Sequence, residues 1–191
     1  MHTTRASLLI RIKDSSDATA WTDFDAIYRP MLIRFAASRG LDRGAAEEIA
    51  QQCMVTISDH IKGFDYDPKK GRFKGWLRTM VGNRVRNHFR DRREKGAESH
   101  DFQRDQYREL SPDEAFDKIW LEEHLRHCLH RVRAEEGDAA FLPFQAYALE
   151  QRPVEEVCGE FGVSANQLYK LKWRLTQSLA QKMKEISEVP E

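Results

Sequence analysis

The sequence predicts an all-α protein built from two small helical domains. Its 191 residues, 40% hydrophobic and 32% charged, are typical of a globular chain long enough for two such domains. Apolar residues recur at intervals of three and four along almost the whole chain, which is the period of amphipathic helices. Residues 96–112 lose this period and most of their apolar content, so we expect a linker there between domains at 1–95 and 113–191.

Three helices are expected in the first domain. Two follow the apolar residues spaced from Trp21 to Phe35 and from Ala46 to Ile61, and "SRGLDRG" joins them. A third begins near Phe73, after the turn-rich "GFDYDPKKG". Its predicted apolar face consists of Phe73, Trp76, Leu77, Met80, Val81, Val85 and Phe89. We assign these aromatic residues, Trp76 included, mainly to the core.

Positive charge is concentrated on this third helix. The chain has no net charge, but residues 1–68 carry −2, residues 69–95 carry +9 and residues 96–191 carry −7. Arg78, Asn83, Arg86, Arg90 and Arg93 lie opposite the apolar face. A merely solvated helix face usually interleaves acids for pairing, and few are present here. Residues 163–184 form a second basic stretch without an acid, so the sequence indicates a polyanion held at two places.

The second domain is predicted to end in a helix-turn-helix. A long helix around residues 116–132 and another over "AAFLPFQAYAL" come first. Pro153 suits the first position of a short helix, Gly162 its left-handed end, and Ser164 the cap of a longer basic helix. The buried stripe of that helix would be Leu168, Leu171, Leu175 and Leu179.

Polar residues of the longer helix fit base edges and phosphates in a major groove. The candidates are Asn166, Gln167, Lys170, Trp173 and Arg174. An ordinary helical hairpin with a wet basic face is the alternative that this segment leaves open.

The sequence gives no indication of catalysis, so we expect neither an enzyme nor a cofactor. It contains no phosphate-binding glycine loop, nucleophile elbow or convincing acidic dyad. His124, His127, Cys128 and His130 cluster in "HLRHCLH", but no remote Cys or His pair completes a metal cage. Cys53, Cys128 and Cys158 are expected to be free thiols. Neither a signal peptide nor a membrane span is predicted, so we expect a cytoplasmic protein that does not engage membranes.

The order of these pieces resembles the extracytoplasmic-function (ECF) class of bacterial sigma-70 family RNA polymerase sigma factors. The run from "AAEEIAQQ" through "GRFKGWLRTMVGNRV" is similar to the family's second conserved region, and "VEEVCGEFGVSANQLYKLKWR" is similar to its C-terminal helix-turn-helix. The resemblance covers roughly residues 5–186. It implies a promoter-specificity subunit that binds core RNA polymerase, recognises the −10 and −35 promoter elements and helps to open the strands.

The resemblance also implies residue roles. Core polymerase would bind the polar face Glu47, Glu48, Gln51 and Gln52, although the family usually has an acid where Gln52 stands. The −10 element, as melted single strand, would contact Phe64, Tyr66, Arg78, Asn83, Arg86, Asn87 and Arg90. The −35 duplex would contact Asn166, Gln167, Lys170, Trp173 and Arg174, with Leu171 and Thr176 departing from the arginines frequent in this helix. An anti-sigma protein is a further candidate partner.

Two alternatives stay open at this point. A stand-alone helix-turn-helix regulator would bind duplex DNA through residues 153–184, but it leaves the basic face at residues 74–93 unexplained. A sigma-like adaptor would bind polymerase or an inhibitor without directing initiation.

Overall fold

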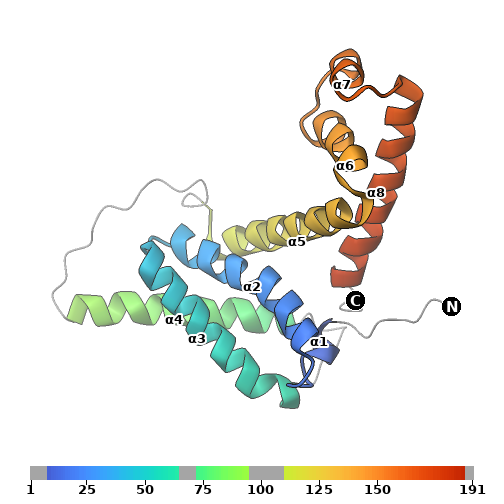
Figure 1. Ribbon diagram of the computed structural model, residues 1–191. Coiled ribbons are helices and arrows are strands. Elements are labelled where there is room, and N and C mark those ends of the chain that lie inside the picture. The colour runs from blue at the N-terminus through green and yellow to red at the C-terminus, as the bar shows by residue number, and fades with distance from the viewer. Residues whose placement is uncertain (1–7, 65–71, 95–109, 188–191) are drawn as a thin grey trace. The chain divides into compact units, whose positions relative to one another are not determined.

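The computed structural model describes residues 8–64, 72–94 and 110–187, and within these ranges the secondary structure is helical without a strand (Figure 1). The chain divides into a first unit that extends to Glu123 and a second unit, His124–Ser187. These observations confirm the predicted all-α fold. The predicted turn "GFDYDPKKG" (residues 63–71) lies outside the described residues from residue 65 onward, and so does most of the predicted linker.

The first unit contains the three predicted helices. They are α2 (Ala18–Ser38), α3 (Arg43–His60) and α4 (Arg72–Glu94), preceded by the short α1 (Leu8–Arg11). A 3-10 turn, η1 (Ile61–Gly63), extends α3. The division between the units falls inside α5 (Pro112–Glu136), so the first half of that helix belongs to the first unit.

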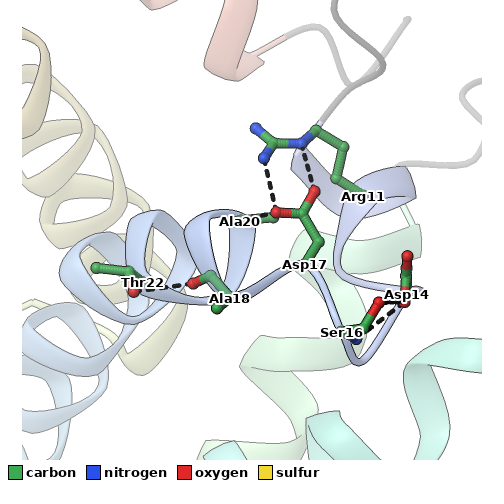
Figure 2. Close-up of polar contacts among 7 residues, drawn as sticks. All are labelled: Arg11, Asp14, Ser16, Asp17, Ala18, Ala20 and Thr22. Atoms are coloured by element: carbon green, nitrogen blue, oxygen red, sulfur yellow. Dashed lines mark hydrogen bonds and ion pairs between the residues drawn. The ribbon is translucent and has the colours of Figure 1, made fainter.

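Helix α2 begins at a carboxylate that has two functions. Asp17 accepts a hydrogen bond from the backbone N–H of Ala20 at 2.9 Å, which caps the helix, and a bidentate pair from Arg11 at 2.9 Å (Figure 2). The Ala20 N–H, and then Arg11, hold the pKa of Asp17 below its usual value. Asp17 therefore fixes α1 against the start of α2.

A group of aromatic side chains forms the core of the first unit. Phe24 and Tyr28 of α2 lie 6.0 and 5.4 Å from the ring of Phe73 on α4. The first half of α5 adds Trp120, 5.5 Å from Tyr28, and Phe116, whose ring is 5.3 Å from that of Phe35. Phe73 and Phe116 are buried, as the helical period predicts for Phe73.

Ion pairs hold the same half of α5 against α2. Arg34 donates to Glu122 at 2.7 Å and also to Glu123, which is only 1% exposed. A buried carboxylate needs such a cationic partner, because burial alone would disfavour its charge. Residues 112–123 thus belong with the first unit by packing and by charge. The second unit begins at His124, eleven residues after residue 113, where the sequence predicts the start of the second domain.

The second unit consists of the rest of α5, α6 (Asp138–Phe144), a π-helical turn η3 (Gln145–Leu149), α7 (Val154–Phe161) and α8 (Ala165–Ser187). One hydrophobic cluster joins α5, α6 and α8 through Val132, Phe141, Phe144 and Leu175. A second joins η3, α7 and α8 through Ala146, Val157 and Leu168. The predicted leucine stripe of α8 therefore faces this core, with Leu171 and Leu179 partly buried beside it.

Helices α7 and α8 form the predicted helix-turn-helix. Gly162 ends α7 in the left-handed region at φ 66°, as expected for a residue without a Cβ. Ser164 caps α8, because its Oγ accepts from the Gln167 N–H at 3.3 Å. One detail of the prediction is wrong. Pro153 is the N-cap of α7, with ψ 142°, and not its first helical residue.

Candidate nucleic-acid and protein interfaces

The exposed face of α3 carries the four residues predicted to bind core polymerase. Glu47, Glu48, Gln51 and Gln52 are all exposed, while Ile49 and Cys53 of the same helix are buried. Local pairs order the face, since Arg43 donates to Glu47 at 2.8 Å and Gln52 donates to Glu48 at 3.1 Å. The prediction therefore placed all four residues on a single accessible surface.

A groove of about 590 Å³ lies beside this face, between α2 and α3. Trp21, Met54 and Val55 contribute its apolar lining, and Val55 is 50% exposed. Its polar edge is ordered by Arg29, which donates to Gln51 at 2.8 Å and pairs with Asp25 at 2.7 Å. An exposed apolar surface with a polar rim is typical of a protein interface. The sequence analysis did not identify Val55 as an interface residue. An apolar residue outside the apolar stripe of α3 could have indicated an exposed apolar surface.

The outward face of α4 is polar and cationic. Asn83, Arg86, Asn87 and Arg90 are exposed, while Val81 and Val85 of the same helix are buried. Arg86 donates to the Asn83 amide oxygen, and Arg90 lies 3.5 Å from Asp91 and 4.0 Å from Glu94. Both acids are themselves more than half exposed, so these pairs bind weakly and can exchange for a phosphate.

Arg78, also predicted to contact the −10 element, faces a different environment. Its Nε lies 3.6 Å from Asp113 in the first turn of α5, and the Lys74 ammonium lies 2.7 Å from Asp117. Lys74 also sits 5.7 Å from the ring centre of Trp120. Acidic residues of α5 thus partly neutralise the positive charge at the start of α4 within the first unit. The sequence did not predict these pairs, because the two helices are far apart along the chain.

Phe64 belongs to an aromatic group instead of standing alone in a loop. Its ring lies 5.2 Å from Trp76 and 6.0 Å from Phe73, and both Phe64 and Trp76 are half-buried. The core assignment of Trp76 is therefore only half right, because part of its ring remains accessible. Tyr66, the other predicted loop aromatic, lies outside the described residues. The accessible parts of Phe64 and Trp76 are suited to base stacking.

Arg84, unlike the exposed arginines of α4, lies on the side of the helix that packs against α3. It points to α3, where it donates to the Gln52 amide oxygen at 3.0 Å and to the Thr56 hydroxyl. Cys53 lies nearby, and burial raises the pKa of its thiol to about 11 although Arg84 acts in the opposite direction. Cys53 is therefore a neutral core residue.

The predicted −35 residues share the exposed side of α8. Asn166, Gln167, Lys170, Trp173 and Arg174 are all exposed. Two have protein partners: the Gln167 amide oxygen accepts from the Ser164 N–H at 2.8 Å, and Arg174 pairs with Glu136 of α5 at 2.8 Å. Within the part of the chain that the structure describes, Asn166, Lys170 and Trp173 make no side-chain hydrogen bond or ion pair.

Neither a cluster of metal-ligating side chains nor a membrane-spanning helix occurs in the described ranges. Among residues 8–64, 72–94 and 110–187, no three His, Cys, Asp or Glu side chains converge in a way that could hold a metal ion. None of the helices described there combines the length and the apolar character that crossing a membrane demands.

The geometry thus defines a helical protein with an exposed Glu/Gln surface and a cationic helix face in one unit and a helix-turn-helix in the other. Residues 26–95, which run from within α2 through α4, match the family model described as Sigma-70 region 2. No curated protein matches the chain.

The match supports a sigma-70 family sigma factor and covers both predicted surfaces of the first unit, the α3 face and the α4 face. Region 2 is a non-enzymatic transcription-factor domain and implies binding to core RNA polymerase and promoter DNA. The second unit lies outside the matched residues.

Proposed function

We propose that this protein is a cytoplasmic promoter-specificity factor of the ECF class. It binds core RNA polymerase through α3, melts and holds the −10 element on α4, and reads the −35 duplex with α8. The observation that carries the proposal is the region 2 match over residues 26–95, in which an exposed Glu/Gln face and an exposed Arg/Asn face occupy different helices of one unit.

Core binding by α3 is supported by surface chemistry. Glu47, Glu48, Gln51 and Gln52 form an acceptor-rich face, and the groove with Trp21 and Val55 adds apolar area next to it. A polar rim around a small apolar centre fits a protein partner better than a nucleic acid, whose phosphates the carboxylates would repel. We therefore assign Trp21, Arg29 and Val55 to the same interface.

Strand opening by α4 is supported by two kinds of group close together. Arg86 and Arg90 supply cations for the backbone of a single strand, and Asn83 and Asn87 supply amide groups for base edges. The half-buried rings of Phe64 and Trp76 offer a stacking surface, and stacking contributes about 1–3 kcal/mol for each base held. That is comparable to the few kcal/mol that unstacking a nucleotide costs.

Duplex recognition by α8 is supported by the helix-turn-helix geometry and by its basic composition. The second helix of the motif is α8 itself, which Ser164 caps. It carries Lys170, Lys172 and Arg174 in its first three turns. The second unit lies outside the family match, so this part of the proposal depends on the geometry of α7 and α8 alone.

Reconstituted transcription tests the proposal directly. The purified protein is added to sigma-free core polymerase on fragmented DNA from its own source, and transcript start sites are mapped by sequencing. Discrete new start sites with shared upstream elements are the expected result. Stable co-elution with active core but no transcripts would indicate the adaptor, and duplex binding without any co-elution would indicate the stand-alone regulator.

A further inference from the structure

The outward side of α8 carries one large exposed aromatic ring, Trp173, with Tyr169 at its edge. Leu168 and Leu175 are fully buried, and the turn of about 100° per residue puts Lys170, Trp173 and Gln177 on the opposite side of the helix. Trp173 is 69% exposed and Tyr169 is 50% exposed. Exposure of two large aromatic rings to water is unfavourable, so covering them makes the binding of a partner more favourable.

Two of the polar side chains that could read bases are engaged within the protein. The Gln167 amide oxygen accepts from both the backbone N–H and the hydroxyl of Ser164, at 2.8 and 2.9 Å. Arg174 is held by Glu136 at 2.8 Å. Gln167 thus lacks the free acceptor that a bidentate contact to adenine requires, and Arg174 has to leave Glu136 to reach guanine. Trp173 is the large apolar side chain at the centre of the face, next to the exposed polar side chains of Asn166, Lys170 and Gln177.

The partner that fits this face is duplex DNA. Residues 163–184 contain five basic residues and no acid, which favours a polyanion over an ordinary protein surface. A groove of about 650 Å³ runs along the helix between Val163 and Trp173. Trp173 lies about 12 Å along α8 from its first residue, within the first three turns, and in a helix-turn-helix the N-terminal part of the second helix contacts base edges.

We propose that Trp173, with Tyr169 beside it, selects thymine in the −35 duplex by packing against its C5-methyl group. That methyl is the apolar group that base pairs display in the major groove. Lys170, one turn before Trp173 and exposed, contacts the adjacent phosphate. This inference rests on the proposed function of α8 in binding duplex DNA and adds the base that it prefers.

Deoxyuridine substitution tests the inference, because it removes only the methyl group. The full-length protein bound to core polymerase first selects upstream duplexes from a randomised library. Each selected thymine is then replaced by deoxyuridine and the affinity is measured again. We expect one or two positions at which affinity falls about fourfold, the effect of one buried methyl group.

Variants of Trp173 connect the effect to the side chain. Trp173→Phe keeps an apolar ring without the indole N–H and retains the preference for thymine over deoxyuridine. Trp173→Ala binds more weakly and binds both duplexes equally. The side chain is largely exposed, so we expect both variants to unfold at the temperature of the parent protein.

Three results would overturn the inference. The first is that the selected motif contains no thymine. The second is that duplexes with thymine and with deoxyuridine bind with equal affinity at every position. The third is a deoxyuridine effect that persists unchanged in Trp173→Ala. Each of these leaves duplex binding by α8 standing. If no upstream duplex is bound at all, the proposed −35 function fails as well, and a protein partner for Trp173 takes its place.

Discussion

Helices α4 and α8 have the same length, 23 residues, and both expose basic side chains, but they place their aromatic residues on opposite sides. Helix α4 turns Phe73 and part of Trp76 inward and exposes Arg86, Asn87 and Arg90. Helix α8 turns leucines inward and leaves Trp173 outward.

Under the proposed function, this difference corresponds to two forms of DNA. A melted strand offers a mobile backbone, which arginines hold, and bases that can be stacked in a pocket beside the helix. A duplex keeps its bases stacked and offers edges and methyl groups to a helix that enters the groove. Charge alone would make the two helices equivalent, so the position of the aromatic rings distinguishes them.

The largest effect is expected from removing the outward arginines of α4. Arg86→Ala with Arg90→Ala should lower open-complex formation by about 100-fold or more, because each charged contact to a phosphate contributes about 1.5–3 kcal/mol and the variant removes two of them. Strand opening is followed by permanganate reactivity of thymines near the start site. The salt dependence of binding should become shallower by about one charge for each arginine.

Arg84 provides the matched control on the same helix. Because it faces Gln52 and Thr56, Arg84→Ala should leave the salt dependence of DNA binding unchanged and should instead lower stability or core affinity. Equal loss of core affinity in Arg84→Ala and in the Arg86/Arg90 variant would show that all these residues serve folding. The comparison of the two helices would then lose its basis.

A second prediction separates two basic residues of α8. Lys170→Ala should weaken duplex binding by about tenfold without changing thermal stability, since Lys170 is exposed, has no ion-pair partner among the described residues and would contribute mainly through phosphate. Arg174→Ala should weaken binding and also lower the melting temperature slightly, because Glu136 loses its ion pair. Electrophoretic mobility shift and thermal melting measure the two effects. Identical melting temperatures for both variants would argue that the Arg174–Glu136 pair contributes nothing to the fold.

The sequence predicted the helices well because their apolar residues repeat strictly. The Trp21–Phe35 and Ala46–Ile61 patterns lie in α2 and in α3 with η1, and the left-handed Gly162 ends α7 as expected. Helical period and capping are local properties, so one stretch of sequence is enough to determine them.

Long-range pairing was not predictable in the same way. Nothing in the local pattern of α5 shows that Glu123 meets Arg34, 89 residues earlier, or that Asp113 and Asp117 meet Arg78 and Lys74. The capping hydrogen bond of Gln167 was not predicted either. It occupies the amide oxygen that we expected to contact a base. Residue type and helical face were sufficient to find the candidate surfaces but not to find which side chains were already paired.

A third prediction tests the neutralisation of α4 by α5. Asp113→Asn with Asp117→Asn should increase affinity for single-stranded −10 DNA by about two- to threefold, because each exposed ion pair contributes only about 0.2–1 kcal/mol. Fluorescence anisotropy with a labelled single strand measures the change. Lys118→Gln, an exposed substitution on the same helix, is the control for a charge change in α5 and should not increase affinity. An unchanged affinity in the Asp113/Asp117 variant would mean that these acids do not compete with DNA.

The last effect concerns Cys53 under the inward face of α4, and it is absent at neutral pH. The folded thiol has a pKa of about 11 instead of its ordinary 9.0, since burial outweighs the opposing charge of Arg84. The unfolded chain therefore releases this proton first, and the free energy of unfolding falls as pH rises from 9 to 11, by about 2–3 kcal/mol for the full shift. Urea unfolding of the parent and of Cys53→Ala isolates the thiol, because other titrating groups are common to both. The stability advantage of the parent should shrink between pH 9 and 11. A constant difference would mean that Arg84 offsets burial and that the inner face of α4 is electrostatically as active as the outer one.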